Sequence, residues 1–187
     1  MPSDKLKSLI KPVVLTQKVI WFALFASMIF YVFFAYFFLT RNQALTSNYL
    51  EAYGIIIYIV AVVSAVASVW YYRKSLSDTR LSYLLSASPD AEKLALDFKT
   101  RKADDERLAA LKSLDVRELV IYSLMLELQK VTMIVMILNE IVLICGFILA
   151  FMTDDPYKIF PFAAAAIVLS VWMFPRAGRL IERARAL

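Results

Sequence analysis

Four long apolar stretches constrain the fold of this chain more than any other feature of its sequence. Residues 19–39 and 52–72 are each 21 residues long and contain no charged side chain. Residues 131–152 contain a single charged residue, and residues 159–174 form a shorter run of 16. About 20 apolar residues in helical form span the ~30 Å hydrocarbon core of a bilayer, and the shorter run reaches that length if Pro156 begins its helix. We therefore predict an all-α polytopic membrane protein with four transmembrane helices in two antiparallel hairpins.

The composition agrees with a membrane protein and argues against several other classes. Hydrophobic residues make up 61% of the chain, whereas soluble domains contain about 45–50%. The chain has no histidine, which excludes imidazole ligation of haem, histidine-based zinc sites and Ser-His or Cys-His catalysis. No nucleophile–base pair, metal cluster or phosphate-binding glycine loop is found in the sequence. We therefore expect no enzymatic activity, no catalytic residues, no metal site and no cofactor.

The distribution of positive charge predicts the orientation in the membrane. Residues 1–18, 73–130 and 175–187 hold 19 of the 21 Lys and Arg residues. Segments rich in Lys and Arg stay in the cytoplasm during insertion, so we place both termini and the central segment there, with the bacterial cytoplasmic (inner) membrane as the expected location. The net charge of +5 then reflects topology and attraction to anionic lipid, and we expect no nucleic-acid partner. The predicted parts are a cytoplasmic amphipathic N-terminus, a first transmembrane hairpin, a cytoplasmic helical insert, a second transmembrane hairpin and a basic cytoplasmic tail, at residues 1–18, 19–72, 73–130, 131–174 and 175–187.

Both terminal segments show apolar residues at helical spacing between basic residues. In the first segment this pattern predicts a short helix at the inner membrane interface that is broken near Pro12. The tail repeats the pattern, with Leu180 and Ile181 on its apolar side. Two interpretations remain open, because these helices can either lie on the lipid or simply be solvated ends. On the first interpretation the basic side chains that contact lipid headgroups are Arg176, Arg179 and Arg183.

The central segment is predicted to be helical throughout. Ser88 and Pro89 are typical of a helix start, and Asp115 with Glu118 forms a capping box. Neither Gly nor Pro follows until Gly146, so we expect one helix of roughly 35 residues that continues into the third span. The apolar residues of this segment should pack into a helical hairpin or a small bundle. They are Leu76, Leu81, Tyr83, Leu84, Leu85, Leu94, Phe98, Leu108, Leu111, Leu119, Tyr122 and Leu126.

Small residues and one turn predict how the spans pack. Residues 153–156 are typical of a tight turn in which Asp155 caps the helix that follows. Small side chains four residues apart let helix backbones approach closely in a membrane. The aromatic first span is better suited to face lipid or a partner. The predicted helix-packing residues are Ala61, Ala65, Ser64, Ser68, Ala166 and Ser170.

Glu140 is the most unusual residue of the chain because it lies near the middle of the third span. A lone charge at that depth costs at least ~2.5–3.5 kcal/mol, and no span contains a Lys or Arg to pair with it. We expect a protonated carboxyl, or one that is hydrogen-bonded to Ser64, Ser68 or Ser170. Glu140 is then either a proton or cation site or, together with Asn139, a buried polar group that fastens helices together.

Residues 138–147 resemble the ion-binding helix of the c-type rotor subunits of rotary ATP synthases. In that family a membrane carboxylate is followed six residues later by glycine, and Glu140 and Gly146 match this spacing. The resemblance implies a proton-carrying role for Glu140. The whole pattern, with Asn139-Glu140, the Asp-Asp-Pro-Tyr turn and a last helix ending at Phe174, also resembles a group of small bacterial four-span membrane proteins. That resemblance implies the fold and no particular activity.

Two functional hypotheses follow from these features. The first is a non-enzymatic interaction or scaffold subunit of a membrane assembly, with the bilayer and a second copy or another membrane protein as partners. The alternative is a small proton- or cation-linked membrane subunit that uses Glu140.

Overall fold

The described part of the chain is all-helical. The structure is a computed structural model that describes residues 3–41, 50–86, 89–95, 105–174 and 176–186, and these contain no β-strand. Phe98 and the polar connection expected after the first span lie outside these residues. In chain order the helices are α1 (Asp4–Arg41), α2 (Leu50–Ser75), α3 (Asp78–Ser86), α4 (Ala91–Ala95), α5 (Asp105–Lys112), α6 (Val116–Thr153), the 3₁₀ helix η1 (Pro156–Lys158), α7 (Ile159–Trp172) and α8 (Ala177–Ala186).

Three of these helices, α1, α2 and α6, are long and apolar enough to cross a membrane. The fourth apolar segment, Pro156–Trp172, is shorter. Helices α1 and α6 contain 38 residues each, which corresponds to a length of about 57 Å at 1.5 Å per residue. The expectation of one long helix continuing into the third span is thus confirmed by α6. A membrane-embedded protein follows from the length and apolar character of these helices.

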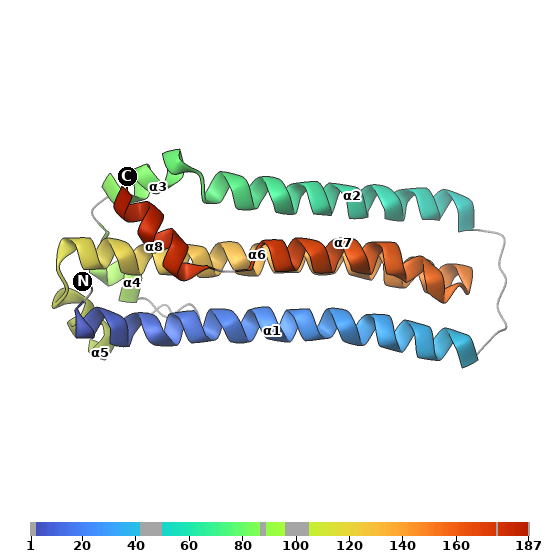
Figure 1. Cartoon of the computed structure of the whole chain (residues 1–187), viewed down its shortest axis with the longest axis horizontal. Helices are drawn as coiled ribbons and strands as arrows, with labels where there is room; N and C mark the ends of the chain where they lie inside the picture. The colour runs from blue at the N-terminus through green and yellow to red at the C-terminus, as the bar shows by residue number, and fades with distance from the viewer. Residues whose placement is uncertain (1–2, 42–49, 87–88, 96–104, 175, 187) are drawn as a thin grey trace. The chain divides into compact units, whose positions relative to one another are not determined.

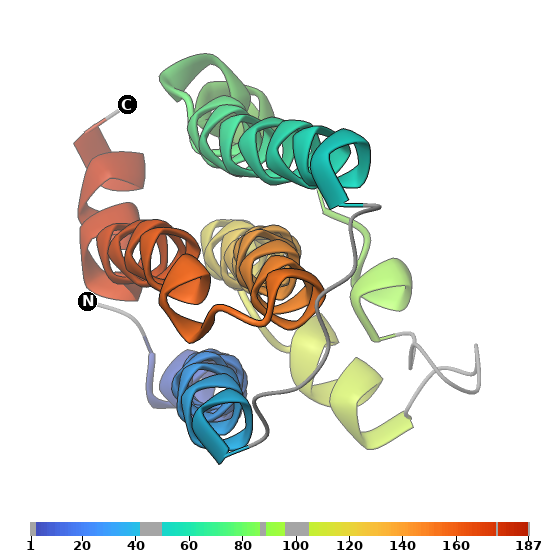
Figure 2. The same cartoon turned by 90° about the vertical axis from the view of Figure 1, so that its right-hand side faces the viewer.

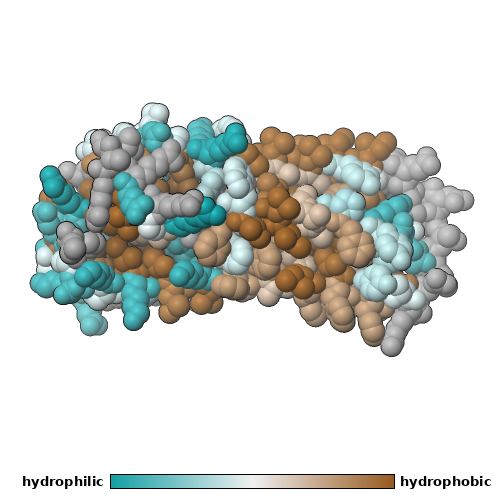
Figure 3. All heavy atoms as spheres, in the orientation of Figure 1, coloured by the Kyte–Doolittle hydropathy of each residue, from teal (hydrophilic) through white to brown (hydrophobic). Residues whose placement is uncertain are grey.

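The chain forms two compact units. One contains Met1–Lys18, Lys74–Lys130 and Pro175–Leu187, and we call it the polar unit. The other contains Val19–Arg73 and Val131–Phe174, and we call it the apolar unit. In Figure 3 hydrophilic side chains gather on the visible surface of the polar unit, whereas hydrophobic side chains cover most of that of the apolar unit.

In the apolar unit, α6 and α7 form a central pair. Figures 1 and 2 show α1 and α2 on opposite sides of this pair, so the two helices of the first predicted hairpin are not packed against each other. In its most apolar stretch α6 is 50% buried, compared with 17% for α1 and 22% for α2. The core therefore forms around α6, and α1 and α2 keep most of their apolar side chains exposed.

A glycine sets the distance between α6 and α7. A Cβ atom added to Gly146 would lie 2.5 Å from Cβ and 2.7 Å from Cγ of Phe162, which is closer than any real Cβ contact. The turn after α6 is as tight as predicted, because Asp154 adopts a left-handed conformation with φ of 52°. The Asp155 carboxylate accepts a hydrogen bond of 3.0 Å from the Tyr157 amide, which confirms the predicted cap.

The polar unit has its own apolar core, which includes both terminal segments. Leu6 is fully buried in it, and Val13 and Leu180 are also buried. The apolar sides of the terminal helices thus pack against protein, and the prediction that they lie on lipid does not hold for these residues. From the central segment Leu81, Leu111 and Tyr122 are buried in the same core. Tyr83 differs from our expectation because its side chain is 62% exposed and lies against the Arg80 guanidinium.

The predicted break at Pro12 is wrong. Pro12 lies inside α1, which continues without interruption from Asp4 to Arg41. Packing of Leu6 and Val13 on either side of the proline stabilises the helix that Pro12 by itself disfavours. Ser88, predicted at the start of the next helix, lies outside the described residues, and at the start of α4 the Asp90 carboxylate accepts a hydrogen bond of 2.9 Å from the Glu92 amide.

Candidate functional site

The most polar place inside the apolar unit is a set of hydrogen bonds centred on Asn139. The side chain of Asn139 is fully buried. Its Oδ1 accepts a hydrogen bond of 2.7 Å from Ser68 Oγ on α2, and its Nδ2 donates one of 3.1 Å to Ser170 Oγ on α7. Asn139 therefore joins α2, α6 and α7 through both ends of one amide group.

Two further hydrogen bonds attach α1 to the central pair. Trp21 Nε1 donates to the backbone carbonyl oxygen of Ser170 over 3.2 Å. Ser27 Oγ lies 2.8 Å from Glu140 Oε1. No buried side-chain nitrogen or oxygen of the described residues lacks a hydrogen-bond partner. A network in which every buried polar atom has a hydrogen-bond partner stabilises the packing of helices, because no desolvated polar group is left unpaired.

The partner of Glu140 differs from the one we expected from the sequence. Ser68 and Ser170 bind Asn139, and Ser64 is buried in the small-residue stripe of α2. Glu140 contacts Ser27 because residues 139 and 140 point about 100° apart around α6, one toward α2 and α7 and the other toward α1. No sequence pattern pointed to Ser27, because the spacing within one helix does not show which other span packs beside Glu140.

The Ser27 hydroxyl lies within hydrogen-bond distance of two oxygens. Ser27 Oγ lies 2.8 Å from Glu140 Oε1 and also 2.7 Å from the Leu24 carbonyl oxygen. A serine hydroxyl has one hydrogen to donate but can accept two hydrogen bonds. The single hydrogen of Ser27 is therefore shared between two acceptors, Glu140 Oε1 and the Leu24 carbonyl oxygen.

The second oxygen of Glu140 has no such partner. Oε2 forms no hydrogen bond with any residue in the part of the chain that the structure describes, and the Glu140 side chain is partly exposed. Asn139 and Glu140 were predicted together as candidates, and they are now distinguished. Both polar side-chain atoms of Asn139 are buried and hydrogen-bonded. Only one of the two carboxyl oxygens of Glu140 is hydrogen-bonded among the described residues, and its side chain is partly exposed.

Most of the predicted small packing residues are buried. On α2 the buried positions Gly54, Ala61, Ser64 and Ser68 form a single stripe, and Ala65 beside it is partly buried. On α7 both Ala166 and Ser170 are fully buried. The rest of α2 is exposed and strongly apolar. Its exposed residues include Ile55, Ile59, Val62, Val63 and Val66.

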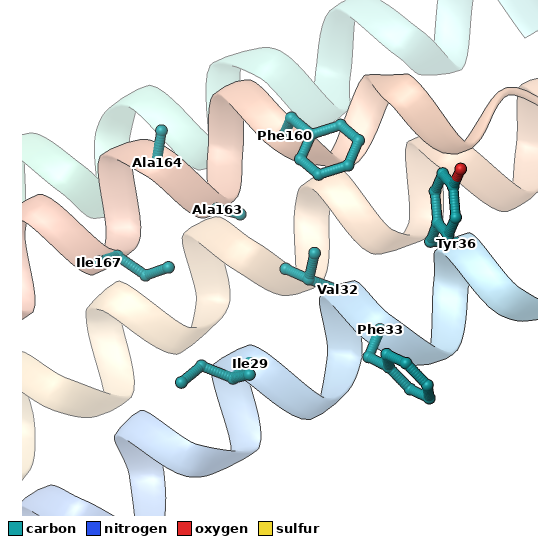
Figure 4. Close-up of a pocket in the computed structure, with 8 residues that line it drawn as sticks. All are labelled: Ile29, Val32, Phe33, Tyr36, Phe160, Ala163, Ala164 and Ile167. Atoms are coloured by element: carbon teal, nitrogen blue, oxygen red, sulfur yellow. The ribbon is translucent and has the colours of Figure 1, made fainter.

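An apolar groove lies between α1 and α7 (Figure 4). Its volume is about 630 Å³, and the Tyr36 hydroxyl is the only polar side-chain atom on the residues that line it. The lining residues are Ile29, Val32, Phe33 and Tyr36 on α1 and Phe160, Ala163, Ala164 and Ile167 on α7. Small alanines opposite large aromatic residues leave this groove between the two helices.

Other candidate groups have ordinary environments. Cys145 is buried in the core of the apolar unit, and no group of three acidic or cysteine residues in the described ranges could hold a metal ion. Arg176, predicted to meet lipid headgroups, is exposed, whereas the side chains of Arg179 and Arg183 lie outside the described part.

Two carboxylates of the polar unit have lowered pKa values. A hydrogen bond of 2.7 Å from the Ser3 backbone amide holds the pKa of Glu118 below its usual value of 4.5. The hydrogen bond from Lys7 to Asp4, at 2.8 Å, lowers the pKa of Asp4 in the same way. The Glu118 contact links the starts of α1 and α6, and Ser3 also accepts a hydrogen bond from the Leu6 amide as the N-cap of α1.

Comparison of the chain with protein-family models, with curated proteins and with solved structures finds no match.

Proposed function

We propose that this protein is a non-enzymatic integral membrane protein that acts as an interaction or scaffold subunit of a membrane assembly. In this proposal α1, α2 and α6 cross the bilayer, and Pro156–Trp172 forms a fourth, shorter span. The positive-inside rule supports cytoplasmic termini and a cytoplasmic segment 73–130, and the bacterial inner membrane as the location. The three long apolar helices support membrane insertion itself.

The observation that carries this proposal is how the polar groups of the apolar unit are used. Asn139 and its neighbours bind one another and fasten the four helices together, with no buried polar atom of the described residues left over for a substrate. What the unit offers to other molecules is therefore its surface. That surface carries broad apolar faces on α1 and α2 and the groove between α1 and α7.

Co-purification from native membranes tests this proposal. The tagged protein is extracted with a mild detergent or a lipid-retaining polymer and purified. The mass of the purified particle is then measured by light scattering or native mass spectrometry. We expect a particle larger than the 21.4 kDa chain, containing further copies or another membrane protein. A monomer that keeps only lipid across several extraction conditions would contradict an interaction role.

The free oxygen of Glu140 favours a second candidate, a proton- or cation-linked subunit. A partly exposed carboxyl beside a serine hydroxyl can exchange a proton or accept a cation. In proteoliposomes with an imposed pH gradient, this role predicts a proton flux that Glu140→Gln abolishes. The matched control is Glu127→Gln, which changes a carboxyl on the same helix but within the polar unit. Equal flux in all three proteins and in empty liposomes would eliminate the alternative.

A further inference from the structure

One face of α6 remains uncovered although α6 is the central helix of the apolar unit. Met133, Ile137 and Ile148 are 40%, 48% and 43% exposed, and Glu140 and Ile144 are partly exposed on the same side. We call these five residues the α6 seam. At 100° per residue they lie opposite Gly146, and therefore on the side of α6 that is turned away from α7.

The α6 seam contains a polar atom that lipid cannot satisfy. Glu140 Oε2 has no hydrogen-bond partner among the described residues, and its position lies about 15 Å along α6 from Lys130. In a bilayer core about 30 Å thick, this depth is near the middle. Acyl chains offer no hydrogen-bond donor, so an unpaired carboxyl oxygen there is unfavourable.

We propose that a second copy of this chain packs its α6 seam against the first, around a two-fold axis along the membrane normal. This proposal rests on the interaction role proposed above and names the partner and the surface. Two copies inserted with the same topology place equal residues at equal depth. The Glu140 side chains of the two copies then meet near the axis, where a proton held on Oε2 of one carboxyl is donated to Oε2 of the other, while each Oε1 keeps its contact with Ser27.

The spacing of the seam fits this arrangement. Its members are separated by four, three, four and four residues, which keeps all five on one face of a helix with 3.6 residues per turn. Glu140 occupies the middle of the seam, with apolar neighbours on both sides that exclude water from the carboxyl pair.

The groove between α1 and α7 is the competing surface for a second copy. It is wholly apolar apart from the Tyr36 hydroxyl, and acyl chains alone can fill it. The α6 seam differs because it presents an acceptor that needs a donor. This difference makes the seam the surface that favours a protein partner over lipid.

Cysteine cross-linking in native membranes tests the surface directly. Cys145, the single cysteine, is replaced by Ala, and single cysteines are then introduced by Ile137→Cys or Ile144→Cys. Matched controls are Val63→Cys, which is 60% exposed on α2, and Phe33→Cys in the groove, which is 66% exposed. We expect oxidation to give a covalent dimer with the two seam variants and not with the controls. These variants keep Glu140, so a folding defect of a Glu140 substitution does not affect the result.

Substitution of Glu140 tests the role of the carboxyl. Glu140→Leu removes the donor and the acceptor, and we expect the dimer to dissociate about 3- to 30-fold more readily in detergent or lipid. Glu140→Gln retains both kinds of group and should keep the dimer. Asn139→Leu is the comparison, because it damages the internal network while leaving the seam intact.

The outcomes separate this inference from the proposed function. Cross-links at Phe33→Cys alone, or a complex with a different protein and none at the seam, would overturn the α6 dimer and leave the interaction role standing. A dimer that is unchanged in Glu140→Leu would overturn the part assigned to the carboxyl. A protein that is monomeric in membranes by every measurement would contradict both.

Discussion

Replacing Gly146 by alanine tests the close packing on which the apolar unit depends. The new methyl group would lie 2.5, 2.7 and 2.9 Å from Cβ, Cγ and Cδ2 of Phe162, whereas ordinary contacts begin at 3.4 Å. Because the Phe162 Cβ is fixed to the backbone, a change of rotamer cannot remove the clash. Helices α6 and α7 must therefore separate locally by about 1 Å, and overpacking of this kind costs about 1–3 kcal/mol.

Gly54→Ala is the matched control, since its new methyl group would meet only Leu149 Cδ1, at 3.8 Å. Both substitutions gain the same ~0.5–1 kcal/mol from replacing glycine within a helix. The difference between them therefore isolates the clash, and we expect Tm to be about 2–12 °C lower for Gly146→Ala. Thermal unfolding of the detergent-solubilised variants measures this difference. Equal Tm values would refute the close approach of α6 and α7 at Gly146.

Three further predictions concern other contacts. Asn139→Leu leaves the Ser68 and Ser170 hydroxyls with only a methionine sulfur as partner, and it should reduce the free energy of unfolding by about 1–3 kcal/mol in an SDS titration. Glu140→Gln should have little effect, and an Asn139→Leu variant as stable as the wild type would contradict the network. Because the pKa of Glu118 is lowered in the folded protein, its stabilising contribution is present above pH 4.5 and is lost as the pH falls through the lowered value. Melting curves at decreasing pH should therefore decline less in Glu118→Gln than in the wild type, and parallel declines would show that the Ser3 contact is unimportant. Pro12→Ala restores a helix hydrogen bond within α1, so it should raise both Tm and the free energy of unfolding, the latter by up to about 3 kcal/mol. A lower Tm would mean that the proline is needed at that position.

The elements were predictable from the sequence because they depend on local patterns. Apolar runs of lipid length predicted α1, α2 and α6, and the absence of Gly and Pro after Asp115 predicted the length of α6. The Asp155 cap was also predictable, since its partner lies two residues away. Pro12 was misjudged because tertiary packing on both sides of a proline outweighs its local penalty.

The arrangement around the candidate site was less accessible. The sequence singled out Asn139 and Glu140 by their polarity within an apolar run, and it grouped the serines that bind Asn139 with Glu140 instead. Pairing between helices depends on which faces meet, and single-chain periodicity gives the face of each helix without its neighbour. For the same reason the separation of α1 from α2 by the central pair was not predicted.

The hydrogen bonds of the apolar unit impose an order on biogenesis. Trp21, Ser27 and Ser68 all have their interhelical partners on α6 or α7, which are synthesised after α1 and α2. During translation α1 and α2 are therefore in the membrane before these side chains can form their interhelical hydrogen bonds. A chain truncated after Arg73 would retain two apolar helices without the α6 and α7 groups to which they bind. We expect such a chain to be degraded by membrane proteases.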